Sequence, residues 1–172
     1  MNQQNANRIM VKELISISPG IHLRRLQKLL DLSFSTTRYH VNNLLRDGEV
    51  VSSPDGGYTR LYPVGTADGM KAIYACLQNE NVRAVFNALL SGESAQRTQG
   101  ELSEKLGLPR STLSECEALL GRVGLAKRSF ALDGRVVYDV RDKEQAAALL
   151  QLFARRGILD KASDRFIDLW DW

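Results

Sequence analysis

The stretch PGIHLRRLQKLLDLSFSTTRYHVNNLLRDGEV, residues 19–50, decides the fold that this sequence predicts. Pro19-Gly20 ends any preceding helix, and the leucines that follow recur at the spacing of a short amphipathic helix. Residues 31–34 have the composition of a tight connection. Ser35 is predicted to cap a third helix, which ends at Gly48. Two helices joined by so short a turn make a helix-turn-helix.

The segments on either side complete a winged helix. Before the stretch, apolar residues at helical spacing predict a helix over residues 4–17. After it, residues 49–53 and 58–62 have the composition of two strands. Pro54-Asp55-Gly56-Gly57 between them predicts a hairpin turn, because Asp-Gly and Gly-Gly tolerate positive φ. We therefore predict an N-terminal winged-helix domain over residues 1–64.

The same order of elements then repeats. A linking helix at residues 70–77 precedes a second set, in which Thr98 and Glu101 have the spacing of a capping box. The predicted helices of this set lie at 82–90, 101–106 and 111–123, and its strands at 125–132 and 135–140, around Asp133-Gly134. The predicted fold class is mainly α with small β-hairpin wings (α+β). The predicted parts are winged-helix domains at 1–64 and 80–141, a linking segment at 65–79, and C-terminal helices at 142–172.

Two segments carry a resemblance to known proteins. Residues 19–50 resemble archaeal winged-helix transcriptional regulators, in which Pro-Gly-Ile precedes the second helix and a Tyr-His pair, here Tyr39-His40, lies in the recognition helix. The segment GELSEKLGLPRSTLSECEALLGRVGL, residues 100–125, is similar to the winged-helix core shared with MarR- and ArsR-type regulators. The resemblance extends over about residues 6–140. It implies DNA binding and transcriptional control, and it names neither an operator nor an effector.

Composition and charge agree with a DNA-binding protein. The chain has 172 residues, of which 44% are hydrophobic and 25% charged, as in ordinary globular proteins. Its net charge of +3 comes from residues 1–64, which hold eight basic and five acidic side chains, while the remainder holds equal numbers of both. The first domain alone therefore carries the excess of cations that phosphate contacts require. A solvated mixed surface is the alternative.

The sequence also predicts where the protein works. No run of about 18 apolar residues is present, so we expect no membrane span. The polar residues 1–7 lack the apolar core of a signal peptide, so export is not expected. Two cysteines without a close-spaced pair fit a reducing compartment. A cytoplasmic location is the expectation.

The third helix is expected to read DNA. On a helical projection Thr37, Val41, Leu44 and Leu45 face the core, and the opposite arc is polar. Four residues are predicted to contact base edges: Thr36, Tyr39, Asn42 and Asn43. Three further residues are predicted at the edge of the groove: Ser35, His40 and Arg46. Of these, Ser35 and Arg46 are expected to contact the phosphate backbone. Arg38 lies beside the core face in this projection and would reach DNA only by extending along the helix.

Cations outside that helix extend the predicted DNA site. Arg24, Arg25 and Lys28 open onto the exposed side of the second helix, where they either clamp phosphate or merely serve solubility. Arg60 lies in the wing, although Asp55 at the wing tip works against close phosphate contact.

The second recognition helix differs from the first. Ala118 and Gly121 offer little to a base and permit close packing, and Glu115 and Glu117 are predicted to flank the groove face, where they would repel phosphate. A dimerisation or regulatory module is therefore favoured. DNA binding by this domain stays open through four basic residues: Arg110, Lys127, Arg128 and Arg135.

The chain carries no pattern of an enzyme. His22 and His40 have no carboxylate or cysteine at metal-ligand spacing, and no phosphate-binding loop or nucleophile elbow is present. Cys76 and Cys116 lie on apolar helix faces and are expected to be buried. We expect no catalytic activity, no metal and no cofactor.

The C-terminal segment is unusually aromatic for a chain end. Four of its residues are predicted to dock onto a surface: Phe166, Leu169, Trp170 and Trp172. That surface is either the second domain of the same chain or the seam of a dimer.

Three functions follow from these observations. The first is a regulator of transcription that binds double-stranded DNA as a homodimer. The second is a protein-interaction scaffold of chromosome-organising or transcription machinery, because tandem winged helices also serve there. The third is a redox- or ligand-sensing form of the first, and the sequence names no ligand for it.

Overall fold

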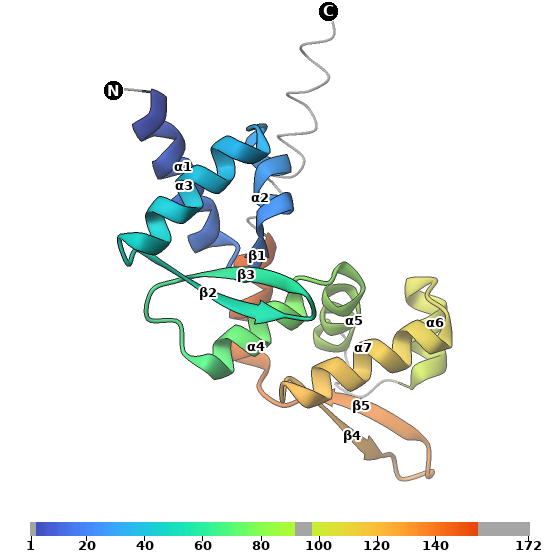
Figure 1. Ribbon diagram of the computed structural model, residues 1–172. Helices are drawn as coiled ribbons and strands as arrows, with labels where there is room; N and C mark the ends of the chain where they lie inside the picture. The colour runs from blue at the N-terminus through green and yellow to red at the C-terminus, as the bar shows by residue number, and fades with distance from the viewer. Residues whose placement is uncertain (1–2, 92–97, 155–172) are drawn as a thin grey trace, which may run out of the picture. The chain divides into compact units, whose positions relative to one another are not determined.

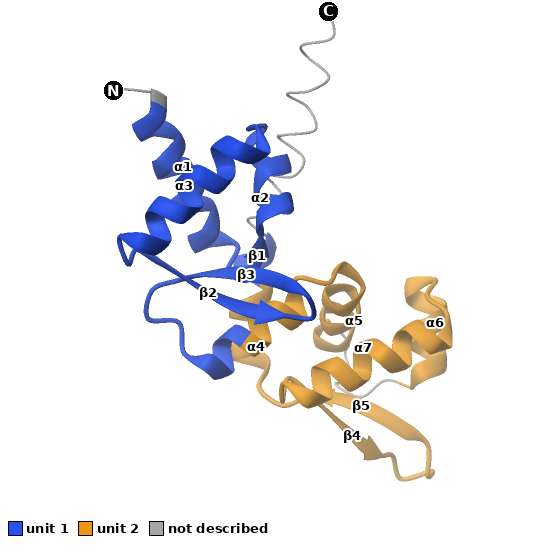
Figure 2. Cartoon of the chain, in the orientation of Figure 1, with its two compact units in different colours: residues 1–71, 151–172 blue, residues 72–150 orange. Residues whose placement is uncertain are grey.

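The computed structural model describes residues 3–91 and 98–154 (Figure 1). The chain divides into two compact units, residues 1–71 with 151–172 and residues 72–150 (Figure 2). The described elements are mostly helices, with two small antiparallel sheets. The predicted fold class, mainly α with β-hairpins, is confirmed. The predicted docking residues Phe166, Leu169, Trp170 and Trp172 lie outside the described residues.

The first unit contains the predicted helix-turn-helix. Its elements are α1 (Gln3–Ile17), β1 (Ile21–His22), α2 (Leu23–Leu30), α3 (Phe34–Arg46), β2 (Val50–Asp55) and β3 (Tyr58–Pro63), and α4 (Asp68–Leu77) begins in it. The connection between α2 and α3 is short because Asp31 adopts the left-handed conformation, at φ 49° and ψ 39°. It closes α2 as a glycine usually does.

The start of α3 differs from the prediction. Ser33, not Ser35, is its N-cap, and the Ser33 Oγ accepts a hydrogen bond from the backbone N–H of Thr36 at 3.1 Å. The prediction of a Ser35 cap was wrong because two serines stand within one turn. An N-cap side chain accepts a hydrogen bond from the N–H of the second or third helical residue, and here the N–H of Thr36 bonds Ser33. Ser35 lies exposed in the first turn, with its hydroxyl 2.9 Å from that of Ser33.

The wing is a three-stranded sheet of order β1-β3-β2. The β2–β3 hairpin turns at Gly56 and Gly57, whose φ angles of 52° and 88° are the pair of positive values that a two-residue type I′ turn requires. The strand β1, which sequence reasoning missed, is only two residues long and pairs Ile21 with Leu61. It ties the start of the helix-turn-helix to the wing.

The core of the first unit is formed by one face of every element. Nine buried side chains make it: Val11, Leu14, Ile15, Ile21, Leu26, Val41, Leu44, Val50 and Leu61. Burial of each stabilises the fold by about 1.5–3 kcal/mol relative to an exposed position. Because α3 contributes Val41 and Leu44, its inward face is held and its opposite face is left for solvent.

The second unit has the same order of helices and hairpin. Its elements are α5 (Glu80–Leu90), α6 (Gln99–Leu106), α7 (Arg110–Arg122), β4 (Ala126–Phe130) and β5 (Val136–Val140), followed by helical residues from 143. The capping box predicted from Thr98 and Glu101 is confirmed, since each side chain accepts a hydrogen bond from the other residue's N–H. The strands β4 and β5 are shorter than predicted and pair antiparallel around the turn at Gly134.

Both cysteines are buried free thiols, as predicted. Burial raises the pKa of Cys76 to about 11 and also raises the pKa of Cys116. A thiol that stays protonated reacts slowly with oxidants, so burial works against a redox role for either. Within residues 3–91 and 98–154, no helix has both the length and the apolar character to cross a bilayer.

Candidate nucleic-acid interface

The outer face of α3 is a continuous polar strip. Its members are exposed and recur at helical spacing: Ser35, Arg38, Tyr39, Asn42 and Arg46. We call these five residues the reading strip. Tyr39 at its centre is 55% exposed. The strip contains hydroxyl, amide and guanidinium groups and no carboxylate, which is the chemistry that hydrogen-bonds base edges and phosphates.

The inward side of α3 holds the strip in place. Thr37, Val41 and Leu44 are buried, as predicted, and the Thr37 hydroxyl donates to the carbonyl of Ser33 at 2.9 Å. A helix anchored along one face by buried side chains rotates little about its own axis. The reading strip is therefore presented in one fixed orientation.

Three predicted residues of α3 lie elsewhere than expected. Arg38 is fully on the exposed side, whereas the projection placed it beside the core. Thr36 and Asn43 are half-buried at the edges of the strip, and the Thr36 hydroxyl is 2.7 Å from the Ser33 hydroxyl. The centre of the exposed face is therefore Arg38, Tyr39 and Asn42.

His40 does not belong to the reading strip. Its side chain is only 3% exposed, and its ring meets that of Tyr39 edge to face, with centroids 5.3 Å apart. Burial, followed by the charge of Arg8, lowers the pKa of His40, so the ring is neutral near pH 7. His40 supports Tyr39 from inside and cannot itself contact a base without leaving the core.

The exposed cations of α2 lie on one side of that helix. Arg24 and Lys28 are exposed and four residues apart, so their side chains lie one turn from each other. Arg25 is half-buried, and its backbone N–H donates to Nδ1 of His22 at 3.2 Å. Of the three predicted phosphate contacts on α2, Arg24 and Lys28 are placed to make them.

Arg60 is turned toward the protein. Its Nη1 donates to the carbonyl of Gly20 at 3.0 Å, its Nε pairs with Asp55, and the side chain is 16% exposed. Arg60 thus joins the wing tip to the segment before α2. The prediction that it contacts DNA does not fit this placement. The exposed aromatic of the wing is Tyr58, whose ring stacks on His22 with centroids 5.9 Å apart.

Two carboxylates near the end of α3 are held by cations of α1, a feature that the sequence did not reveal. Arg8 Nη1 lies 2.8 Å from Asp47 Oδ2, and the same guanidinium pairs with Glu49. Lys12 Nζ lies 2.6 Å from Glu49 Oε2. These cations, together with Arg46, whose Nε lies 3.3 Å from Asp47 Oδ1, lower the pKa of both carboxyls, which remain charged but are neutralised in place. Little negative potential is left beside the reading strip.

The basic residues of the second unit are exposed but partly engaged. Arg110, Lys127, Arg128 and Arg135 all reach solvent. Arg135 Nε lies 2.6 Å from Asp133 Oδ2, and the Arg128 guanidinium carbon lies 5.8 Å from the centre of the Phe130 ring. These four residues remain a predicted secondary contact.

Glu117 corrects the prediction about α7. Two carboxylates were expected at the margin of its groove face, but only Glu115 is exposed, and Glu117 is buried. A projection of α7 alone missed this because the hairpin β4–β5 covers that side of the helix. Among the residues described, no group of three or more histidine, cysteine or acidic side chains is placed to hold a metal ion.

Comparison with known proteins supports the assignment of the first unit. Residues 5–72 match the family model HTH_HVO_0163_N, described as an N-terminal HTH (helix-turn-helix) domain. No curated protein matches the sequence.

Two solved structures align over most of the chain with low similarity. ScpB from Mycobacterium tuberculosis is 12% identical, with 91% of this chain and 97% of that chain covered, at a TM-score of 0.31. A conserved hypothetical protein from Chlorobium tepidum is 17% identical, with 88% and 98% covered, at a TM-score of 0.29. Both scores are too low to carry an argument. The sequence match and the geometry of α2 and α3 together assign residues 5–72 as a helix-turn-helix domain.

Proposed function

We propose that this protein is a transcriptional regulator that binds double-stranded DNA through α3 of the first unit, in the major groove and as a homodimer, with a second winged-helix domain following the first. The observation that carries the proposal is the reading strip: an exposed, carboxylate-free face on a helix whose other face is buried. A major groove about 12 Å wide accepts one α-helix, and this face offers it groups that bond bases.

The residues of the strip have different expected roles. Asn42 carries an amide that pairs in bidentate fashion with adenine, and Arg38 carries the guanidinium that pairs best with guanine. Tyr39 adds an apolar ring suited to a thymine methyl. Phosphate contacts fall to Ser35, Arg46, Arg24 and Lys28, which lie around the strip. Contacts with phosphates position the protein on DNA, and contacts with base edges select the sequence.

Selection of bound sequences from a random duplex pool tests the proposal. We expect a palindromic motif whose half-sites lie about 10–10.5 base pairs apart, or a multiple of that, since two first units related by a two-fold axis meet the same face of DNA. Asn42→Ala should weaken binding to the selected site about 5- to 150-fold while leaving affinity for random duplex nearly unchanged, because a base contact contributes about 1–3 kcal/mol.

Asn87→Ala is the matched control, because Asn87 is an exposed asparagine in the middle of α5. It should leave both affinities unchanged. Recovery of no motif, or equal losses on selected and random duplex for Asn42→Ala, would refute sequence reading by this face.

A protein-interaction scaffold is the second candidate. It is favoured by the outer face of α7, where Ser114, Ala118 and Gly121 are exposed small residues that allow close approach of another backbone. Titration with random duplex at rising salt separates the two functions. Steep loss of affinity with salt supports the regulator, because phosphate contacts release counterions. Absent or salt-insensitive binding supports the scaffold.

A further inference from the structure

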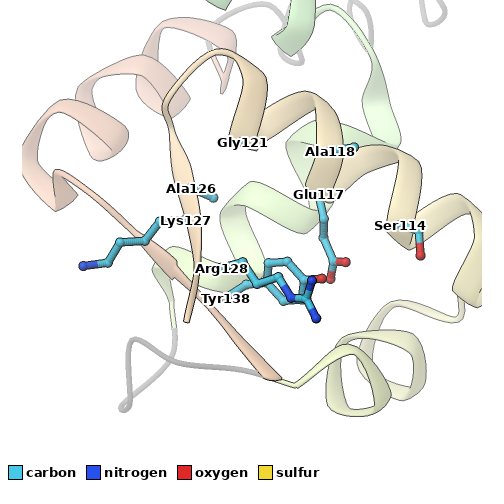
Figure 3. A pocket seen from close by; sticks show the side chains of 8 residues that line it. All are labelled: Ser114, Glu117, Ala118, Gly121, Ala126, Lys127, Arg128 and Tyr138. Carbon is cyan, nitrogen blue, oxygen red and sulfur yellow. The ribbon is translucent and has the colours of Figure 1, made fainter. Parts of the chain in front are cut away.

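An open-sided cavity of about 230 Å³ lies in the second unit, between α7 and the hairpin β4–β5 (Figure 3). Glu117, Arg128 and Tyr138 give it one polar end, and Ala118, Gly121 and Ala126 form an apolar wall. The cavity is smaller than the roughly 300–1,000 Å³ of sites for drug-sized molecules, and its volume equals that of about eight waters at 30 Å³ each. It suits one small organic molecule.

Glu117 is the unusual member of this cavity. Its side chain is only 5% exposed, and its Oε2 accepts a hydrogen bond from Gln99 Nε2 at 3.1 Å. Its Oε1 is buried and outside standard hydrogen-bond geometry with any described residue, and the Tyr138 side chain is the one donor besides Gln99 that acts on this carboxyl. Burial raises the pKa of Glu117 more than Tyr138, Gln99 and Arg128 lower it. A buried carboxylate oxygen that lacks a well-aligned donor destabilises the folded chain, so a ligand that donates to Oε1 is favoured.

The other charge at this end is positive. The guanidinium of Arg128 lies beside the Glu117 carboxylate and the Tyr138 ring, whereas the side chain of Lys127 points away from them (Figure 3). Arg128 is exposed, and its guanidinium carries five N–H donors. The polar end therefore holds one anion and one cation within a small space.

The apolar wall has room for a side chain. Gly121 lies on the outer face of α7, and a Cβ built on it would meet no atom within 4 Å. Ala118, one turn earlier, and the buried Ala126 of β4 continue the same wall. An apolar group bound here would cover all three small residues.

We propose that this cavity binds a free α-amino acid with an apolar side chain. The ammonium group donates to Oε1 of Glu117, the carboxylate accepts from Arg128, and the side chain covers Ala118, Gly121 and Ala126. The charges select the zwitterion: an amine without a carboxylate is repelled by Arg128, and a carboxylate without an amine is repelled by Glu117. The proposal does not depend on DNA binding by the first unit.

Calorimetric titration of the full chain tests it. L-Valine, L-leucine, L-isoleucine, L-methionine and L-phenylalanine are titrated one at a time, together with two analogues of leucine that each lack one charge, isopentylamine and 4-methylpentanoate. We expect at least one amino acid to bind with a stoichiometry of one per chain. For leucine, each analogue should bind at least tenfold more weakly than the amino acid.

Three substitutions locate the site. Glu117→Gln and Arg128→Gln should each weaken binding at least tenfold, and Gly121→Leu should abolish it by filling the cavity. Leucine has a higher helix propensity than glycine, so Gly121→Leu is expected to fold. The matched controls on the same helix, Glu115→Gln, Arg110→Gln and Ser111→Leu, should bind as the parent does. Circular dichroism melting verifies that each variant is folded.

Several results would overturn the proposal. One is that none of the amino acids binds. Another is that a singly charged analogue binds as tightly as leucine. A third is that the folded Gly121→Leu variant binds as tightly as the parent protein. A leucine-containing peptide with blocked termini that binds more tightly than free leucine, and loses binding in Gly121→Leu, would assign the cavity to a polypeptide partner instead.

Discussion

Arg8 Nη1 of α1 lies 2.8 Å from Oδ2 of Asp47, the residue that closes α3, and the same guanidinium also pairs with Glu49. The two acidic residues that follow the reading strip are thus held by a cation from a helix more than 35 positions earlier in the chain. The contact ties α1 to the end of α3 and removes negative potential where a phosphate backbone would run.

Replacement of Arg8 by methionine should therefore weaken DNA binding by more than the loss of one positive charge. It leaves Asp47 with only its neighbour Arg46, and Glu49 with only Lys12, as cationic partners. We expect affinity for random duplex to fall about 5- to 10-fold in fluorescence anisotropy at low salt. The control Lys71→Gln removes a cation that pairs with Asp68, away from α3, and should cost no more than about twofold. Equal effects of both substitutions would show that the contact with Asp47 has no role in binding.

The buried His40 should make the first unit sensitive to mild acid. Its pKa in the folded protein is lowered by burial and by Arg8, so the unfolded chain takes up the proton first as pH falls. Stability is then complete above the unfolded pKa of about 6.5 and declines as pH falls below it. The thermal midpoint of the parent protein should decrease when the pH is lowered from 7.5 to 5.5. His40→Gln should flatten that slope, whatever its effect on stability at pH 7.5. A slope that the substitution leaves unchanged would assign the acid sensitivity to another group.

Arg60 and Lys28 should behave differently although both were predicted to bind DNA. Arg60 donates to the carbonyl of Gly20, so Arg60→Gln should lower the thermal midpoint and leave the salt dependence of DNA binding unchanged. Lys28 is exposed on α2, so Lys28→Gln should keep the midpoint and reduce the slope of log affinity against log salt by about 0.9, the contribution of one phosphate contact. The reverse pattern would place Arg60 on the DNA and refute its structural role.

Two glycines allow a matched test of the wing turn. Gly57 has a φ of 88° and Gly69 lies in α4, and a Cβ at either position meets nothing within 4 Å. Gly57→Ala should destabilise the protein by about 1 kcal/mol, because only the backbone conformation opposes the methyl group. Gly69→Ala should stabilise it by about 0.5–1 kcal/mol, since alanine favours a helix. Urea denaturation measures both. A neutral Gly57→Ala would mean that the hairpin does not need this turn.

Sequence reasoning was most successful where the deciding interactions are local. The order of helices and hairpins, the turn at Gly56 and Gly57, and the capping box of Thr98 follow from residues within a few positions of one another. The wrong cap on α3 shows the limit of such reasoning, because Ser33 and Ser35 are equally good caps by composition. Backbone geometry chose between them.

The sequence by itself determined the class of fold, the helix-turn-helix and the polar character of the reading face, since hydrophobic periodicity and turn residues act along the chain. Only the tertiary structure decided which side chains each predicted surface presents. Arg38 is exposed, His40 is buried, Arg60 is turned inward and Glu117 lies beneath a hairpin. Each depends on what packs against the edge of its element. That neighbour comes from a distant part of the chain, so no pattern within one helix or strand contains it.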